Sequence, residues 1–339
     1  MGLLLSCSFY YYVFVHYNYN TIKLFKLYIN GALICCYIGL IQTVSFLIKF
    51  GPGYNFLWIF NKWNILEGGL VGIRVNSIFS EPSQFAIVVS PLIFLSLYNL
   101  LTRKFFLLSK VNCFVVLLSL VLSTSSTGYL GFLISGILIA INYKKILDVF
   151  VILGLLSFGV VFLYNNVDDF RSRADAYLNI INKDKLTLDD INSSSFVQYN
   201  NFHVATTSFL NHPIGGTGMG SYSFAYEKYS LTKDSDFIIK TGFDFNSQDA
   251  NSLFLRVLTE MGIIGVLFLL ILVFKCFVIK ENVGSDNISW LLSSSILVII
   301  LLYFFRQGNY FLNGFPFFVW LYYYNWVNFK EYKEKLQND

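Results

Sequence analysis

Long apolar runs alternate with shorter polar connections along most of the chain. About nine of these runs approach or exceed the length that an α-helix needs to cross a hydrocarbon core of roughly 30 Å. The pattern therefore predicts an all-α fold, a polytopic transmembrane helical bundle of about nine spans. The runs lie near residues 2–17, 27–48, 82–101, 111–125, 127–142, 146–164, 253–279, 288–305 and 314–328.

One connection, residues 165–252, is much longer than the others, and loops of this size are usually functional or disordered. Residues 202–210 carry apolar positions at helical spacing and are followed by a proline, which favours the end of a helix. We therefore expect a folded extracytoplasmic domain over residues 165–252. It would separate N-terminal transmembrane helices (1–164) from C-terminal transmembrane helices and a cytoplasmic tail (253–339).

Composition and charge support a membrane protein and orient it. Of the 339 residues, 55% are hydrophobic and only 13% are charged, against roughly 25% charged in soluble proteins. Short connections rich in Lys and Arg mark the cytoplasmic side. They are the connections that hold Lys23 and Lys26, then Arg103, Lys104 and Lys110, then Lys144 and Lys145, then Lys280, and the tail with Lys330, Lys333 and Lys335. The opposite side receives the long connection, which holds 11 acidic and 7 basic residues.

Familiar metal and nucleotide motifs are missing from the sequence. The five cysteines all lie in apolar runs, where a thiol behaves as a small hydrophobic group. No HExxH, CxxC, Walker or GxSxG pattern occurs, and His16, His203 and His212 are too few and too scattered for a typical zinc site. We expect metal-free chemistry without a cofactor, and no nucleic-acid partner.

The stretch DANSLFLRVLTEMGIIG places opposite charges at the start of an apolar run. Arg256 and Glu260 are four residues apart and share one helix face, and Asp249 and Asn251 lead into that helix. An ionisable residue at membrane depth is a functional candidate. The pair either neutralises itself as a structural feature, or Glu260 holds the guanidinium of Arg256 toward a polar cavity that accepts substrate.

Two further arginines stand at predicted outer membrane boundaries. Arg74 precedes the third run, and Glu81 lies where that run begins. A buried guanidinium needs an anion, either Glu81 or a ligand phosphate, whereas a snorkelling side chain reaches the headgroups. Arg306 directly follows the run 288–305. Snorkelling to the headgroups is the favoured explanation for this arginine, and a contact with substrate is the alternative. The hydroxyl-rich turn and the glycines of LSTSSTGYLGFLISG suggest close helix packing.

A glycine run, GGTGMG, follows His212 and Pro213 in the long connection. Gly216 and Gly218 permit positive φ and the approach of backbone N–H groups to an anion, although glycine runs more commonly form turns. His212 is either a general base at an outer active site or a helix C-cap.

Four stretches, in order, resemble the signatures of the O-antigen polymerase and ligase superfamily of bacterial inner-membrane proteins. They are IRVNSIFSEPSQFA, STSSTGYLGF, FLNHPIGGTGMGSY and DANSLFLRVLTEMGIIG, and they span about residues 70 to 270. The resemblance implies a metal-independent inverting glycosyltransferase that uses undecaprenyl-pyrophosphate-linked sugars at the periplasmic face. It also implies that Arg74 meets the donor pyrophosphate, and it matches glycines 215–220, Asn251, Glu260 and Gly262 to family positions.

Departures from the family pattern favour the polymerase branch. The ligases place a histidine directly before the asparagine, whereas this chain has Ala250. A family arginine upstream of the HP pair corresponds to Gln198, so Arg171 or Arg173 would have to replace it as a substrate contact. We expect an O-antigen polymerase with a lipid-linked oligosaccharide and the bilayer as partners, and a chain-length regulator as a candidate partner. The alternatives are an O-antigen ligase and a flippase of lipid-linked sugar.

Overall fold

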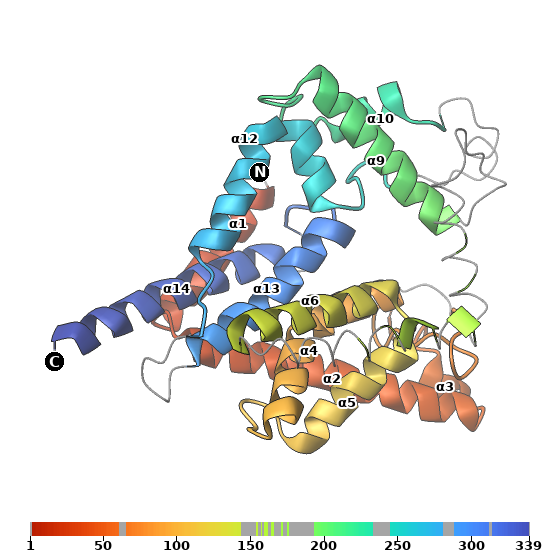
Figure 1. Ribbon diagram of the computed structural model, residues 1–339. Helices are drawn as coiled ribbons and strands as arrows, with labels where there is room; N and C mark the ends of the chain where they lie inside the picture. The colour runs from red at the N-terminus through yellow and green to blue at the C-terminus, as the bar shows by residue number, and fades with distance from the viewer. Residues whose placement is uncertain are drawn as a thin grey trace. The chain divides into compact units, whose positions relative to one another are not determined.

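In the computed structural model, all regular elements in the part of the chain that it describes are helices (Figure 1). That part comprises residues 2–60, 66–143, 193–232, 245–280, 288–311 and 314–338, with a few single positions between 154 and 175. Within these residues the sole β contact is an isolated bridge between Glu67 and Ile73. The all-α fold predicted from the sequence is confirmed.

Eight of the nine apolar runs coincide with a described helix, and most of the run at 146–164 lies outside the described residues. The helices are α1 (Gly2–His16), α2 (Thr21–Leu47), α3 (Gly51–Tyr54), α4 (Pro82–Thr102), α5 (Lys110–Ser123), α6 (Ser126–Tyr143), α9 (Ser193–Asn211), α10 (Tyr222–Tyr229), α12 (Leu253–Lys275), α13 (Ser289–Arg306) and α14 (Phe315–Asn338).

Four of these helices, α2, α4, α12 and α13, are long and apolar enough to cross a membrane, and α1, α5 and most of α6 form shorter apolar helices. The helix α14 does not meet the same criteria of length and composition, although its first half was predicted as a span. Its first half includes three consecutive tyrosines and Asn325, and its second half carries Lys330, Glu331, Lys333, Glu334 and Lys335, so the helix is not apolar enough over its length. The chain is a polytopic helical membrane protein, as its sequence predicts.

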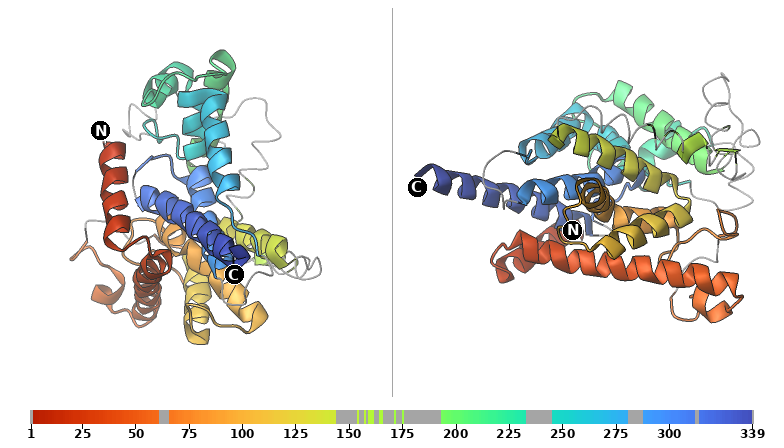
Figure 2. Two further views of the ribbon diagram at one scale, coloured as in Figure 1. Left: turned by 90° about the vertical axis from the view of Figure 1, so that its left-hand side faces the viewer. Right: turned by 60° about the horizontal axis from the view of Figure 1, so that its bottom comes forward.

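The chain divides into two compact units, one formed by residues 1–169, 276–302 and 316–339 and the other by residues 170–275 and 303–315. In the first unit α4 packs against α2, α5 and α6, which Figure 2 shows from two sides. A Cβ at Gly131 would lie 3.0 Å from Cδ1 of Ile93, so α6 approaches α4 closely. This agrees with the packing role predicted for the glycines of residues 122–136.

In the second unit α9, α10 and α12 pack together around a small core. The core consists of Phe196, Val197, Val204, Tyr222, Ala225, Tyr226, Phe245 and Ala250, with Tyr229 and Leu255 packed against it. This unit combines most of the predicted loop domain with the whole of α12 and residues 303–315. The predicted division of the chain into three domains therefore stays a prediction, and its boundaries differ from those of the two units.

The helix α12 is broken at Gly262, where φ is +59° and ψ is −150°. A regular helix would pair the amides of Ile263 and Ile264 with carbonyl groups four residues earlier. Instead, Ile263 donates to the carbonyl of Pro213 at 2.9 Å and Ile264 to that of Ile214 at 3.4 Å. The loop that connects α9 to α10 thus inserts into the hydrogen-bond ladder of α12.

The exchange at the break is reciprocal. The carbonyl of Thr259 accepts from the amide of Thr217 at 3.0 Å, and the carbonyl of Glu260 accepts from that of Gly218 at 2.8 Å. A Cβ on Gly216 would lie 2.4 Å from the carbonyl carbon of Glu260, so this contact also requires a glycine. The break costs the helix two internal bonds and supplies four bonds to the loop, so backbone pairing stabilises it.

The substitution Gly262→Ala should destabilise the protein, whereas Gly215→Ala should not. An alanine at position 262 would hold an L-residue at positive φ, at a cost of about 1–2 kcal/mol. Its Cβ would also lie 2.6 Å from the carbonyl oxygen of Ile214. Gly215 has nothing within 4 Å of a Cβ. Thermal unfolding of the two variants in the same detergent provides the measurement, and equal midpoints would contradict the structural role of the break.

Candidate functional site

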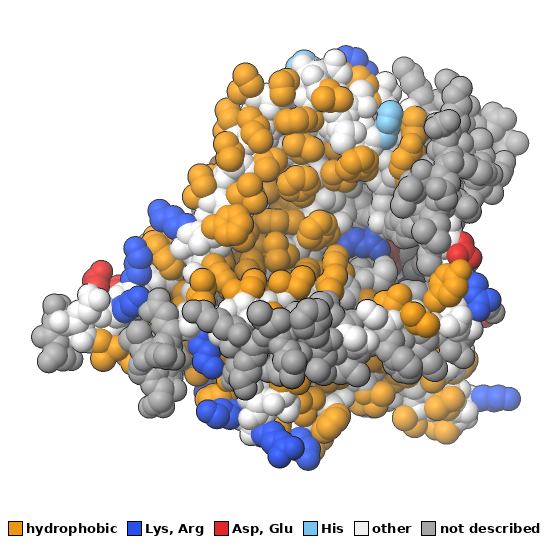
Figure 3. All heavy atoms as spheres, viewed as in Figure 1, with side chains coloured by type: hydrophobic (Ala, Val, Ile, Leu, Met, Phe, Trp, Pro, Cys, Tyr) orange, Lys and Arg blue, Asp and Glu red, His pale blue; other side chains and the backbone are white. Residues whose placement is uncertain are grey.

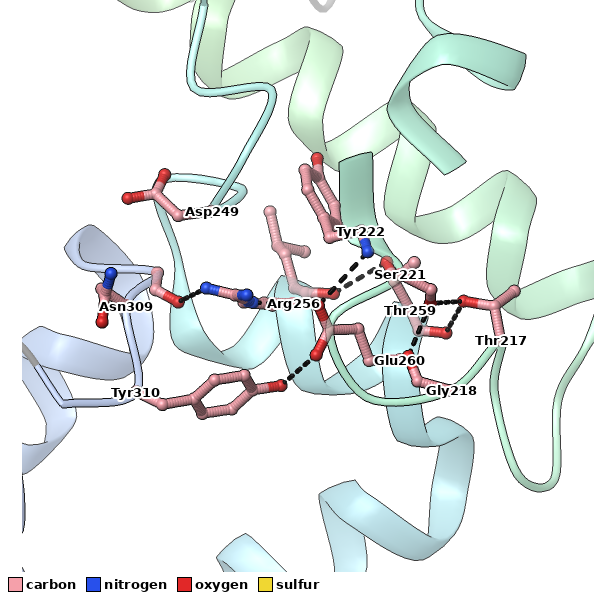
Figure 4. A network of polar contacts seen from close by, with 12 residues as sticks. Thr217, Gly218, Ser221, Tyr222, Asp249, Arg256, Thr259, Glu260, Asn309 and Tyr310 are labelled. Atoms are coloured by element: carbon pink, nitrogen blue, oxygen red, sulfur yellow. Dashed lines mark hydrogen bonds and ion pairs between the residues drawn. The ribbon is translucent and has the colours of Figure 1, made fainter. Parts of the chain in front are cut away.

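The carboxylate of Glu260 is completely buried in the second unit and has three hydrogen-bond donors (Figure 4). Oε1 accepts from Nε of Arg256 at 3.0 Å and from the backbone amide of Tyr222 at 3.2 Å, and Oε2 accepts from the hydroxyl of Tyr310 at 2.7 Å. A buried carboxylate without partners would cost several kcal/mol. These three donors therefore fix Glu260 and join α10, α12 and the segment after α13.

The guanidinium of Arg256 is held on three sides. Besides Nε on Glu260, Nη1 donates to the carbonyl of Gly308 at 3.1 Å, and the group lies over the ring of Tyr310, 4.5 Å from its centroid. Figure 4 shows the guanidinium between the Tyr310 ring and the carbonyl that it contacts. The side chain is 14% exposed. Glu260 of α12 and the segment after α13 therefore fix the arginine in position.

One edge of this guanidinium remains open. Among the described residues, none accepts a hydrogen bond from Nη2 of Arg256, and this atom is not one of the buried polar atoms that lack a partner. The N–H groups of Nη2 therefore make no hydrogen bond within the described residues, in a side chain that is 14% exposed. A fixed guanidinium with an unused edge is suited to bind an anion such as phosphate.

The hydroxyl of Tyr310 is a donor at neutral pH. Burial raises the pKa of Tyr310 above the usual value for a phenol, and the neighbouring carboxylate of Glu260 raises it further. The phenol therefore keeps its proton and can donate to Oε2 of Glu260.

The segment before α12 forms a tight turn against the segment after α13. The carboxylate of Asp249 accepts from the amide of Asn251 at 3.0 Å and from the side chain of Asn246 at 3.1 Å. A Cβ at Gly308 would coincide with the carbonyl of Asp249, so the two backbones touch. Ser252 also donates to the carbonyl of Phe304 at 2.6 Å. This contact brings Gly308 and Tyr310 to the arginine.

The aromatic side chains of α10 mostly serve the core. The hydroxyl of Tyr222 donates to Oδ1 of Asn201 at 2.6 Å, and Asn200 donates to the hydroxyl of Tyr226 at 3.0 Å. Both tyrosines are buried, whereas Phe224 is exposed. Tyr222 and Tyr226 therefore belong to the core of the second unit.

The loop glycines and His212 have different surroundings. The amide of Gly218 is used by the carbonyl of Glu260, as described above, and Gly216 packs on the backbone of α12. Anion binding by these glycines stays a prediction. His212 is exposed, and its backbone amide donates to the carbonyl of Ser208 at 2.9 Å at the end of α9. His212 directly follows the last residue of α9, where a helix C-cap lies. A role of its imidazole as general base stays a prediction.

Arg74 lies in the first unit, where the preceding loop and the turn after α5 surround it. Its backbone amide donates to the carbonyl of Leu66 at 2.9 Å, and Nη2 lies 3.5 Å from the carbonyl of Thr124. The next residues are anchored by Gln42 of α2, whose Oε1 accepts from the amides of Asn76 and Ser77 at 3.2 and 3.0 Å. The arginine is therefore carried on a rigid segment.

The remaining predicted residues are placed as follows. Glu81 is the N-cap residue of α4 and accepts from the hydroxyl of Ser83 at 2.6 Å. Arg306 is the partly buried last residue of α13, and Arg171 is a partly buried single described position. Arg173 lies outside the described residues. For all four, contact with substrate stays a prediction.

Tyr310 and Gly308 were not predicted from the sequence as members of the site. Arg306 could be predicted because a charge at a span boundary is visible in the local sequence. A glycine and a tyrosine just after a span on the predicted outer side were the available signal. The described residues contain no group of three His, Cys, Asp or Glu side chains that could hold a metal ion.

The helices and the buried ionic site define a polytopic membrane protein with a fixed arginine. The family model of the O-antigen ligases matches residues 111–270, from α5 to α12. The match confirms the resemblance to the O-antigen polymerase and ligase superfamily and supports an enzyme of this general class. No match was found among curated proteins or solved structures.

The substitution Tyr310→Phe should lower stability by about 1.5–3 kcal/mol, the usual contribution of a hydrogen bond to a charged group. The ring would remain under Arg256, so the change isolates the hydroxyl. Tyr12→Phe, at an exposed tyrosine of α1, is the matched control and should have little effect. Chemical or thermal unfolding in detergent tests both variants, and an unchanged stability of Tyr310→Phe would show that Glu260 does not depend on this donor.

Proposed function

We propose that the protein is an O-antigen polymerase. In this reaction the growing glycan leaves undecaprenyl pyrophosphate and is transferred to an incoming lipid-linked repeat unit at the periplasmic face of the inner membrane. The observation that carries the proposal is the fixed guanidinium of Arg256, with Nη2 unused, in a chain matched by the O-antigen ligase family model. The partners would be the lipid-linked oligosaccharide and the bilayer.

The chemistry follows from the leaving group. When the bond between the sugar and the diphosphate breaks, negative charge develops on the departing oxygen, and fixed cations or hydrogen-bond donors stabilise that charge. An arginine supplies both without a metal ion, because its planar N–H groups match phosphate oxygens. Arg256 would contact the diphosphate with Nη2, and Arg74 is the second candidate for this contact.

The proposed roles of Glu260 and His212 differ. Glu260 has both oxygens occupied by donors and no exposed surface, so it acts as a positioning residue for Arg256. The exposed imidazole of His212 is the candidate general base for the acceptor hydroxyl. Attack by that hydroxyl on the side opposite to the diphosphate would invert the anomeric carbon.

One position in the sequence favours the assignment as a polymerase over that as a ligase. Ala250, which occupies the place of the ligase histidine, is buried in the core of the second unit. A methyl group there can neither accept nor donate a proton. A deletion strain distinguishes the two activities: loss of a polymerase leaves lipid A core with one repeat unit, whereas loss of a ligase leaves bare core. A flippase, the third candidate, would make no glycosidic bond in a purified system.

The purified protein should convert lipid-linked repeat units into longer chains in the presence of a metal chelator. Arg256→Lys retains the charge but replaces the planar guanidinium with a single ammonium nitrogen, which cannot occupy the positions of Nε, Nη1 and Nη2 at once. We expect it to lose about 10²-fold or more in rate, the usual loss when one transition-state donor is removed. Arg74→Ala should lose activity similarly if it meets the diphosphate.

Arg103→Ala is the matched control, because Arg103 is an exposed arginine in a connection predicted to be cytoplasmic. It should retain full activity. Product length is measured on gels after equal amounts of each folded variant are reconstituted. Normal ladders from both Arg74→Ala and Arg256→Lys would refute the proposed diphosphate contacts, and a purified protein that makes no glycosidic bond would refute the enzyme assignment.

A further inference from the structure

The lipid-facing side of α12 begins at the break. All of the exposed large apolar side chains in α12 follow Gly262, and those before it are buried or half-buried. The exposed ones are Ile263, Ile264, Leu267, Phe268, Leu270, Ile271 and Phe274. Figure 3 shows such side chains over the part of the molecule that Figure 1 draws as α12. This face of a membrane-spanning helix suits contact with acyl chains.

The run from Ile263 to Phe274 is shorter than the hydrocarbon core. At a rise of 1.5 Å per residue it covers about 18 Å, against a core of roughly 30 Å. The apolar surface of the second unit must therefore be extended if this side of the unit is to match the membrane.

The loop inserted at the break continues the same apolar surface. Ile214 is 68% exposed although its carbonyl is bonded to the amide of Ile264, one of the exposed residues of α12. Met219 is 62% exposed and follows Gly218, whose amide is bonded to Glu260. Two large apolar side chains thus lie uncovered on a loop that is bonded to the first residues of the lipid-facing run.

Backbone pairing with α12 lowers the cost of placing this loop at the boundary between the headgroups and the acyl chains. An irregular segment is costly in hydrocarbon because its backbone N–H and C=O groups have no water to bind. Here the carbonyls of Pro213 and Ile214 and the amides of Thr217 and Gly218 are paired with α12. The exposed polar side chain of His212, next to the loop, suits the neighbouring headgroup layer rather than the bilayer centre.

We propose that residues 213–219 form a membrane-embedded wedge, with Ile214 and Met219 in contact with phospholipid acyl chains just below the headgroups. The occupant is the bilayer because the loop surface is continuous with the lipid-facing side of α12 through backbone hydrogen bonds. This inference does not depend on the transferase activity. It would anchor the second unit at a fixed depth by a connection that sequence analysis assigns to the aqueous side.

Depth-dependent fluorescence quenching tests the proposal in the full-length protein. Ile214→Cys and Met219→Cys are labelled with a small thiol-reactive fluorophore and reconstituted in phosphatidylcholine vesicles. Leu267→Cys on α12 is the control for lipid contact, and Glu227→Cys, at an exposed position of α10, is the control for water contact. The unsubstituted protein gives the background from its own cysteines, four of which are buried.

Nitroxide-labelled phospholipid should quench the label at positions 214 and 219 to an extent comparable with position 267. Quenching at the two loop positions should be stronger with the nitroxide near the headgroup end of the acyl chain than near its methyl end. Aqueous iodide should quench only position 227. Quenching of the loop labels by iodide would place the loop in water and overturn the proposal. Protection from both quenchers would show that protein covers the loop, and it would overturn the proposal as well.

Discussion

The second unit depends on the hydrogen-bond exchange at Gly262. Once φ at this residue is positive, two carbonyls and two amides of α12 lose their helical partners and must find others. The loop 213–218 provides four matching groups, and Gly216 allows the two backbones to touch. The break therefore cannot exist without the loop, nor can the loop hold this conformation without the break. The position of Glu260, two residues before Gly262, is a consequence.

Glu260 converts this backbone contact into an ionic site. A buried carboxylate is stable only when hydrogen-bond donors surround it. The three donors to Glu260 come from three separate segments of the chain. Arg256 is restrained in turn by Glu260, Gly308 and the Tyr310 ring. A side chain held in this way loses little further conformational entropy when a ligand binds. The structure thus holds the guanidinium of Arg256 in one position, as the proposed contact with an anion requires.

The sequence was sufficient for the features that depend on local spacing. Apolar runs located eight of the described helices, and a separation of four residues predicted that Arg256 and Glu260 would share one helix face. The break at Gly262 was missed because a glycine in an apolar run is equally compatible with close packing. Tyr222 and Tyr310 lie 38 and 50 residues from Glu260, and no local pattern relates residues so far apart. Tertiary contacts alone complete the site.

The bonds at the break also decide how the proposed diphosphate would be recognised. The amides of Thr217 and Gly218, which a glycine run might have offered to an anion, are used by α12. Recognition must then depend more on the guanidinium of Arg256 than on a backbone nest. Glycosyl transfer passes through an oxocarbenium-like transition state, in which departure of the leaving group is advanced. For the proposed transfer, Glu260 is saturated with donors and Ala250 cannot move a proton, so His212 is the remaining candidate base and stabilisation of the leaving group by Arg256 would contribute most.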